Sequence, residues 1–329
     1  MIHSILKKLA QKQNLSEKEV LFFLEKSVSQ KISPAQIGAF LMGLQLKGET
    51  AEEIAAMVCF LRKKAVPFKH SFKNAVDNCG TGGDASGTFN ISTSAALLAA
   101  KLGAVVIKHG NRAVSSSCGS ADVLEALDYP LLESPRQTLK ILQKDSFCFL
   151  FAPQYHPILK KLAPIRKELG FRSLFNLAAP LANPAHVKRQ LLGVSDAPLL
   201  KTYAEVLQKL GCEHALVVCG KEGLDEISLS GPTQVCELKA GKIRSYSIQP
   251  EDFGFKRCSL EDLKGGSATK NAQILRALFK GKKGPKLDVA ILNAAAVLYV
   301  AGKAKTLQEG VKQLQQFFLK FDTHEKPRK

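Results

Sequence analysis

The sequence lacks any apolar run of about 18 residues, the length that a membrane-spanning helix needs. Tryptophan is absent and aromatic residues make up only 7% of the chain, which gives little support for a base-stacking platform. The N-terminal segment MIHSILKKLAQKQ lacks the apolar core of a signal peptide and is typical of an amphipathic helix. We therefore expect a cytoplasmic protein with no membrane partner.

CxxC spacing is also missing, although the chain has eight cysteines. This absence argues against zinc ribbons and redox-active dithiols. Several cysteines lie in apolar runs, such as Cys148 in FCFLF and Cys219 in ALVVCG. The pattern predicts buried free thiols rather than a disulfide framework or a zinc site.

Acidic residues are scarce relative to basic ones. The formal net charge is +18, and residues 255–286 hold nine Lys or Arg against two Asp or Glu. Three explanations fit: attraction of an anionic small substrate, a nucleic-acid surface, or a generally lysine-rich composition. The third accounts best for most of these charges, and we do not expect nucleic acid to be the partner.

Residues 1–72 are predicted to form a small helical domain, to which residues at about 155–185 return. Apolar residues recur at helical spacing, and their broad faces must pack on each other or on a second subunit. We therefore expect this domain to mediate a homodimer. Three capping boxes mark its helix starts, namely Ser16 with Glu19, Ser33 with Gln36, and Thr50 with Glu53.

From residue 73 onward, short apolar runs alternate with helical patterns. We predict strands at 75–79, 104–108, 147–153 and 214–220, a β-hairpin at 234–248, and helices at 93–102, 122–127, about 267–279 and 287–301. The predicted fold class is α/β: a small all-helical N-terminal domain plus a large α/β domain with a central, mostly parallel sheet, formed by 73–154 and 186–329. Ligands of such sheets bind at the carboxyl ends of the strands.

The predicted strand ends carry polar, glycine-rich loops. GTGGD at 80–84 can turn backbone N–H groups toward a phosphate, but an ordinary tight turn explains it equally well. NIST at 90–93 opens a helix, where Ser and Thr act either as caps or as part of an anion site. KHGNR at 108–112 places two cations and an amide at a strand end, which suits a polyanion. Taken alone, His109 is interpreted as a structural hydrogen-bonding residue.

Asp225 and Glu226 follow the strand predicted at 214–220. They form either a solvated acidic turn or a Mg²⁺ site. A diphosphate site with no other acidic cluster needs Mg²⁺, and this pair is the best candidate for its ligands.

Together, GTGGD…TFNIST, KHGNRAVSS…GSAD.LEAL, APIRKELG.R..FNL and GLDE.SL.GPT, in this order and spacing, resemble the anthranilate phosphoribosyltransferases. The resemblance covers about residues 5–310 and includes KGPK.D…LNAAA.LYVAGKA. It implies that the amine of anthranilate attacks C1 of the ribose in phosphoribosyl pyrophosphate (PRPP) and that pyrophosphate leaves, a step of tryptophan biosynthesis. It also implies two Mg²⁺ per chain and a homodimer.

The resemblance also implies roles for individual residues. No acid or base of the usual kind is expected, and Lys108, Asn111 and Arg166 would position the substrates. Mg²⁺ would be held by Ser92, Asp225 and Glu226, and anthranilate by Gly80, Asn111, His156 and Arg166. PRPP would contact Gly80, Gly83, Asp84, Thr88, Asn90, Ile91, Ser92, Thr93, Lys108, His109, Gly110, Asn111, Arg112, Ala113, Val114, Ser115, Ser116 and Ser120.

Three positions depart from the family pattern. Ala179 and Ala182 stand in NLAAPLANP where NLLGPLTNP is usual, and Cys219 replaces a common histidine. We expect these changes to affect anthranilate binding more than PRPP binding. Two alternatives share the fold: a pyrimidine nucleoside phosphorylase, whose family carries KHGGR in place of KHGNR, and a basic nucleic-acid-binding relative that has lost the transferase motifs.

Overall fold

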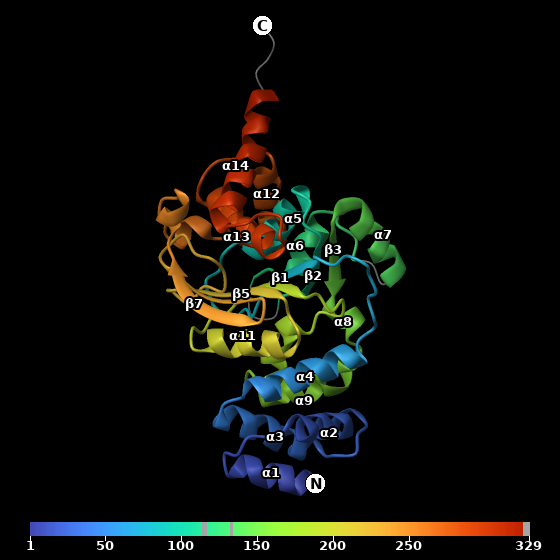
Figure 1. Ribbon diagram of the computed structural model, residues 1–329. Helices are drawn as coiled ribbons and strands as arrows, with labels where there is room; N and C mark the ends of the chain where they lie inside the picture. The colour runs from blue at the N-terminus through green and yellow to red at the C-terminus, as the bar shows by residue number, and fades with distance from the viewer. Residues whose placement is uncertain (114–116, 132–133, 325–329) are drawn as a thin grey trace.

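The computed structural model describes residues 1–113, 117–131 and 134–324, with side chains described to residue 320. The molecule is elongated (Figure 1). A stack of helices formed by the N-terminal residues lies at one end, the sheet lies in the middle, and the C-terminal helix α14 points away at the other end. This arrangement confirms the predicted combination of a helical N-terminal part with a larger α/β part.

The N-terminal part consists of α1 (Ile2–Ala10), α2 (Glu17–Val28), α3 (Pro34–Lys47) and α4 (Ala51–Lys64). All three predicted capping boxes are present, with both reciprocal hydrogen bonds in each. Two helices from the middle of the chain, α9 (Leu159–Leu169) and α10 (Leu174–Ala178), pack against α3 and α4. The apolar faces of these helices share one core with the underside of the sheet.

The sheet has seven strands in the order β3-β2-β1-β4-β5-β6-β7. The first five strands are parallel to one another. β6 runs antiparallel to β5, and β7 runs antiparallel to β6, which confirms a mostly parallel sheet. The predicted hairpin is confirmed, with Ala240 and Gly241 in its turn. The strands are β1 (Val76–Gly80), β2 (Val106–Gly110), β3 (Phe147–Phe151), β4 (Arg189–Gly193), β5 (His214–Gly220), β6 (Thr233–Lys239) and β7 (Lys242–Ile248).

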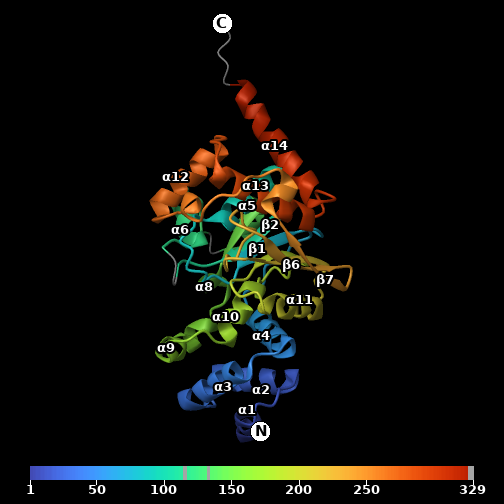
Figure 2. The ribbon, with the colours of Figure 1, turned by 90° about the vertical axis from the view of Figure 1, so that its left-hand side faces the viewer.

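Helices cover both faces of the sheet (Figure 2). On one face lie α5 (Ile91–Lys101) and α13 (Pro285–Val300), whose alanines allow close packing against each other. On the other lies α11 (Leu199–Lys209). The remaining helices are α6 (Ser120–Ala126), α7 (Pro135–Asp145), α8 (Ala152–Tyr155), α12 (Ala268–Phe279) and α14 (Leu307–His324), with short 3₁₀ turns at Ala179–Leu181, Pro250–Phe253 and Glu261–Leu263.

Several predicted bounds shift by about two residues. The second strand begins at Val106 rather than residue 104, and the helix predicted at 93–102 begins at Ile91. The third strand ends at Phe151 because Ala152 and Pro153 open α8. The central strand β4 was not predicted at all. No helix in the described part of the chain is long and apolar enough to span a lipid bilayer.

All eight cysteines are free, as predicted, but burial was predicted too broadly. Cys118, Cys148, Cys219 and Cys236 are buried, whereas Cys59 is exposed on α4. Cys59 lies on the solvent side of a helix whose opposite face fills the core.

A buried carboxylate joins β6 to its neighbours. Glu237 is 3% exposed and contacts His214 Nε2 at 3.0 Å, while the hydroxyls of Tyr299 and Tyr246 donate to it at 2.7 and 3.2 Å. Burial alone would raise the pKa of Glu237, but the hydrogen bonds from His214, Tyr299 and Tyr246 outweigh it and lower the pKa to about 2. The ionised form is therefore part of the native packing between β5, β6, β7 and α13.

Glu237→Gln should destabilise the fold in a pH-dependent manner. Because the folded pKa of about 2 lies below the ordinary value of 4.5, the carboxylate stabilises the fold above pH 4.5 and loses this effect as the pH falls toward 2. We expect a loss of about 3 kcal/mol in unfolding free energy at pH 7, shrinking markedly by pH 3. Urea unfolding at both pH values measures it, with Glu168→Gln as an exposed control. An equal loss at both pH values would refute this role.

Candidate active site

The polar loops predicted from the sequence meet at the carboxyl ends of the parallel strands. β1 ends at Gly80, β2 at Gly110 and β5 at Gly220, and residues 81–84, 111–113 and 221–226 follow them. Parallel strands present these ends along one edge of the sheet. We call the site formed there by residues 80–93, 108–113, 117–120 and 225–226 the strand-end cradle.

Two glycines allow the acidic turn to enter the cradle. The backbone N–H of Gly82 donates to Asp225 Oδ2 at 2.7 Å, across 143 residues of sequence. A Cβ on Gly80 would lie 2.1 Å from Asp225 Oδ2, and one on Gly193 would lie 1.6 Å from the Asp225 carbonyl oxygen. Neither position can hold a side chain while the turn keeps this place.

The carboxylates of the cradle repel one another. Burial, and next the charge of Asp84, raises the pKa of Asp225 to about 6. Burial and Asp225 likewise raise the pKa of Glu226 well above its usual range, while Lys108 opposes the rise. Crowded carboxylates of this kind are stabilised by a divalent cation, so the residues present fit Mg²⁺. No group of three His, Cys, Asp or Glu side chains with metal-binding geometry occurs in the described residues, but Mg²⁺ commonly uses one or two carboxylates plus phosphate oxygens and water.

Lys108 and Ser92 link β2 to the start of α5. Lys108 is 2% exposed, and its Nζ donates to the Asn78 carbonyl and, at 3.4 Å, to Ser92 Oγ. Asn78 Nδ2 donates to the Ser92 carbonyl at 2.7 Å, and the Ser92 backbone N–H faces the carboxylate of Glu226. The structure therefore brings Lys108, Ser92 and Glu226 into one local network.

Several buried polar atoms around the cradle have no hydrogen-bond partner within the described chain. They include Asn78 Oδ1, Asn90 Oδ1, Thr93 Oγ1 and His109 Nε2. An unsatisfied buried polar atom costs about 1–3 kcal/mol, so such a group is rare unless a ligand or water completes it. Their presence beside the start of α5, where Ile91 is the first helical residue, supports a polar ligand at this edge.

In the loop after β2, several groups already form ion pairs or hydrogen bonds with other residues of the chain. The guanidinium of Arg112 forms ion pairs with Glu125 and Asp122, and the Ala113 N–H donates to Asp122 at 2.9 Å. Ser120 Oγ donates to the Asn111 carbonyl at 3.3 Å. In this conformation the guanidinium of Arg112 is held by these two carboxylates, and its backbone N–H donates to Asn111 Oδ1 at 2.8 Å. Val114, Ser115 and Ser116 lie outside the described residues.

His109 and His156 form a neutral pair. Their rings make an edge-to-face contact with centroids 5.1 Å apart. Burial, and next the neighbouring His156, lowers the pKa of His109 well below its usual range. Burial also lowers the pKa of His156 to about 4. At neutral pH both rings are uncharged, which suits contact with a flat aromatic ligand better than proton transfer.

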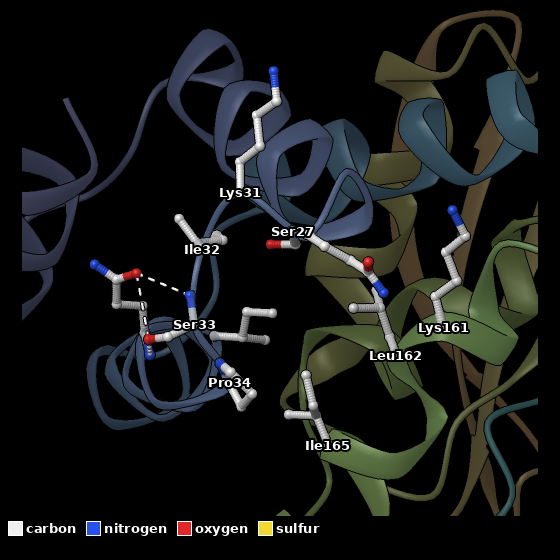
Figure 3. Close-up of a pocket in the computed structure, with 11 residues that line it drawn as sticks. Ser27, Lys31, Ile32, Ser33, Pro34, Lys161, Leu162 and Ile165 are labelled. Atoms are coloured by element: carbon white, nitrogen blue, oxygen red, sulfur yellow. Dashed lines mark hydrogen bonds between the residues drawn. The ribbon is translucent and has the colours of Figure 1, made fainter.

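Arg166 stands apart from these residues, on α9. Its guanidinium lies over the Phe175 ring, 5.0 Å from the centroid, and burial lowers its pKa. The ion pairs of the described residues do not include Arg166, which makes it a half-buried cation available to an external carboxylate. A pocket of about 630 Å³ between α9 and the α2–α3 connection is lined by Lys161, Leu162 and Ile165 but not by Arg166 (Figure 3). It is separate from the strand-end cradle.

Two family models match the chain. The helical bundle domain of the glycosyl transferase family matches residues 3–65, and the a/b domain of the same family matches residues 72–320. An anthranilate phosphoribosyltransferase from Thermoanaerobacter sp. is 47% identical over 95% of this chain and 92% of its own length. One from Desulfitobacterium hafniense is 48% identical over 94% and 92%.

Solved structures agree. The crystal structure of anthranilate phosphoribosyltransferase from Thermus thermophilus superposes with a TM-score of 0.90 at 41% identity, covering 97% of this chain and 96% of its own. The Saccharomyces cerevisiae enzyme in complex with PRPP and Mg has a TM-score of 0.87 at 26% identity, covering 97% and 94%. The chain belongs to the anthranilate phosphoribosyltransferase family.

Sequence reasoning missed several residues that shape the cradle of this phosphoribosyltransferase family member. Arg172 donates to the carbonyls of Gly82 and Thr81 at 3.3 and 3.2 Å and so clamps the glycine loop. Ser195 Oγ donates to the Gly82 carbonyl at 3.2 Å. Arg172 is the second arginine of the APIRKELG.R..FNL motif, but no role was predicted for it, and no local pattern marks Ser195. Asn78 did carry a signal, because β1 contains two polar residues, Asp77 and Asn78, and polar side chains buried in a central strand need buried partners.

The departures from the phosphoribosyltransferase family pattern are accommodated. Ala179 is exposed and has φ −53°, in the right-handed helical region, so the backbone there does not require glycine. Ala182 is buried, and its carbonyl faces His156. Cys219 is buried on β5 and donates to the Gly220 carbonyl at 3.4 Å. Of the three positions that depart from the family pattern, Ala182 is the one that faces a residue expected to bind anthranilate, namely His156.

The double variant Asp225→Asn with Glu226→Gln should lose Mg²⁺-dependent turnover. Both amides preserve size but remove the charges that a divalent cation needs. We expect turnover to fall by about 100-fold or more, because metal stabilisation of developing charge is worth several kcal/mol. Turnover against Mg²⁺ concentration measures it, with Glu222→Gln as the control in the same loop. Full activity of the double variant would place the metal elsewhere.

Proposed function

We propose that this chain transfers the phosphoribosyl group of PRPP to the amine of anthranilate, with the strand-end cradle as the PRPP site. The product is N-(5-phosphoribosyl)anthranilate, and pyrophosphate is released, a step of tryptophan biosynthesis. The observation that carries the proposal is the meeting of Lys108, the glycine loop and the repelling carboxylates of Asp84, Asp225 and Glu226 at one edge of the sheet. A polyphosphate with Mg²⁺ satisfies all of these groups.

The cradle offers PRPP three kinds of contact. Gly80, Gly83 and Thr88 border the loop that approaches the phosphates, Asn90 to Thr93 offer the start of α5, and Lys108 supplies a buried cation. Further contacts would come from Asp84, His109, Gly110, Asn111, Ala113 and Ser120, and from the backbone of Arg112. The same roles for Val114, Ser115 and Ser116 remain predictions.

Mg²⁺ would lie between the phosphates and the acidic turn. Asp225, Glu226 and Ser92 are the residues that would hold it, and two ions per chain would neutralise part of the combined negative charge of PRPP and the carboxylates. When bound, Mg²⁺ neutralises the departing pyrophosphate. The protein contributes the rest: Lys108 and the N–H groups of the glycine loop hold the phosphates, and no strong base is needed because the amine of anthranilate is neutral at pH 7.

Anthranilate would bind between the sheet and the helical part. The Arg166 guanidinium suits its carboxylate, and the uncharged rings of His109 and His156 suit its aromatic ring. Gly80 and Asn111 would border the amine. No hydrogen bond joins Arg166 to the cradle within the described residues, although Arg172 of the same part already contacts the glycine loop; we propose that a further approach of α9 brings Arg166 to the site.

We further propose that residues 1–72 with 155–185 form a domain that moves against 73–154 with 186–329. Exposed apolar side chains on α1 and α3 support a homodimer through the N-terminal helices: Met1 is 67% exposed, Met42 40% and Leu46 71%. A cytoplasmic location stays a prediction. The phosphorylase and nucleic-acid alternatives lose support, because the relatives and structures named above are all anthranilate phosphoribosyltransferases.

A direct assay tests the activity. Anthranilate is fluorescent, and its consumption in the presence of PRPP and Mg²⁺ should be immediate and should stop when Mg²⁺ is chelated. A parallel reaction with a pyrimidine nucleoside and arsenate should give no cleavage. Folded protein that leaves anthranilate untouched would overturn the proposal, and nucleoside cleavage would favour the phosphorylase.

Arg166→Ala should affect one substrate only. Loss of a charge-assisted contact to a carboxylate costs about 1.5–3 kcal/mol, so we expect the anthranilate KM to rise about 10- to 100-fold. The PRPP KM should change less than about twofold, because Lys108 and the carboxylates hold PRPP. Lys167→Ala, at the neighbouring exposed position, is the matched control. An equal rise in both KM values would contradict this assignment.

A further inference from the structure

Helices α12 and α13 lie on the far side of the sheet from the N-terminal helices (Figure 2). A second cavity lies between α12 and the start of α13. Its volume is about 400 Å³, within the range of small-molecule sites. Its floor is apolar and its rim is basic. The floor is formed by Ile274, Ala277, Leu278 and Leu287, and the rim by Lys270, Lys282, Lys283 and Lys286. We call it the lysine cavity.

The positive charge of the lysine cavity is poorly compensated. The ion pairs of the described residues do not include Lys270 or Lys282. Asp262 is the one acidic residue in the lining, and its carboxylate accepts hydrogen bonds from Ser259 N and Oγ at 2.9 and 2.8 Å. Burial lowers the pKa of Lys286; Asp262 opposes this, and the ammonium groups of Lys270 and Lys282 add to it. An anion in the cavity would relieve this repulsion.

The wall of the lysine cavity continues into the strand-end cradle. Lys286 Nζ donates to the Asp262 carbonyl, and the next residue, Leu263, accepts from Phe89 N at 2.9 Å. Gly265 N donates to the Gly87 carbonyl at 2.9 Å, and Lys264 pairs with Thr88. The segment 262–265 therefore begins at the cavity, which Asp262 lines, and continues as a backing for the loop 87–89.

This segment has little room to move alone. A Cβ on Gly265 would lie 2.5 Å from Asn271 Oδ1 and 2.7 Å from Phe89 Cα, so α12, the segment and the loop are in direct contact. Ser117 Oγ also donates to the Gly266 carbonyl at 3.1 Å. These contacts connect the hydrogen bond between Lys286 and Asp262 to the loop that carries Thr88 and Asn90.

We propose that the lysine cavity binds a phosphate monoester carrying a flat apolar group, as in a nucleoside monophosphate, and that its occupancy weakens PRPP binding. The phosphate recruits Lys270, Lys282 and Lys286, while the apolar floor takes the flat group. Lys286 then leaves the Asp262 carbonyl, and the segment 262–265 no longer supports the loop 87–89. The effect on PRPP rests on the proposed function, but binding in the cavity does not.

Calorimetry of the full chain tests binding without turnover. AMP is titrated into the protein with PRPP and Mg²⁺ already present and anthranilate absent, so that the strand-end cradle is filled. We expect AMP to bind the wild type. The variant Lys270→Gln with Lys282→Gln should bind AMP at least about tenfold more weakly, because contacts to a charged group are lost. Lys305→Gln with Lys312→Gln removes the same charge at exposed sites elsewhere and should bind AMP as the wild type does.

Inorganic phosphate and adenosine separate the two halves of the ligand. Each should bind more weakly than AMP, because each lacks one of the two contacts. Equal binding of AMP by the wild type and the cavity variant would overturn the site, as would an equal loss in the control variant. Phosphate that binds as tightly as AMP would overturn the ligand class.

The PRPP KM tests the connection between the two sites. Saturating AMP should raise it about fivefold or more in the wild type, a typical size for coupling between sites. AMP can also compete with PRPP for the strand-end cradle. The measurement that separates the two effects is therefore the PRPP KM of the cavity variant, in which the rise caused by AMP should largely disappear. A rise that persists there assigns the effect to competition and overturns the coupling. An inactive wild-type enzyme would refute the proposed function while the calorimetry still decides the cavity.

Discussion

The close approach of Asp225 to Gly80 and Gly193 is the contact on which the strand-end cradle depends. The Asp225 carboxylate and carbonyl occupy the space where two side chains would otherwise begin. The turn after β5 can therefore reach across β4 to the end of β1, where Gly82 N–H binds it. Without these glycines, the acidic turn and the phosphate loop would be separated by the width of a strand. The proposed metal ligands and the proposed phosphate donors come together because two side chains are missing, and the hydrogen bond from Gly82 then holds them in place.

The strand-end cradle contains a cluster of acidic side chains, although the molecule as a whole is strongly basic. The chain carries a net charge of +18, yet Asp84, Asp225 and Glu226 gather where an anion is expected to bind. The raised pKa values of Asp225 and Glu226 show that their ionised forms are unfavourable without a cation. A polyphosphate accompanied by Mg²⁺ resolves the conflict, because the cation satisfies the carboxylates while Lys108 and the general field attract the phosphates. Neither partner alone would suit this site.

Local features were predictable from the sequence, and long-range ones were not. The capping boxes at Ser16, Ser33 and Thr50 were found because each depends on residues three apart. The strand β4 was missed because RQLLG is short, follows a proline-rich segment and shows no alternation, although it lies at the centre of the sheet. Arg172 clamps a loop 90 residues away, and no local pattern reports such a contact. The adjacent acids Asp225 and Glu226 stood out because such a pair after a buried strand is unusual, and their role as metal ligands stays a proposal. The ion pairs of Arg112 with Asp122 and Glu125, by contrast, could not be predicted from the sequence, because they depend on the position of α6.

The division of the substrate groups between two parts of the molecule has a chemical reason. Loss of pyrophosphate leaves positive charge on the ribose, and water would capture it if the cradle were complete before the acceptor arrived. Arg166 lies on α9 with the helical part, whereas Lys108 and the carboxylates lie on the sheet. An acceptor carboxylate that binds Arg166 brings its amine with it, so the contact that completes the site also delivers the nucleophile. Under the proposed function, specificity for an amine with a neighbouring carboxylate would follow from the distance between the two parts, and not from a base that activates the amine.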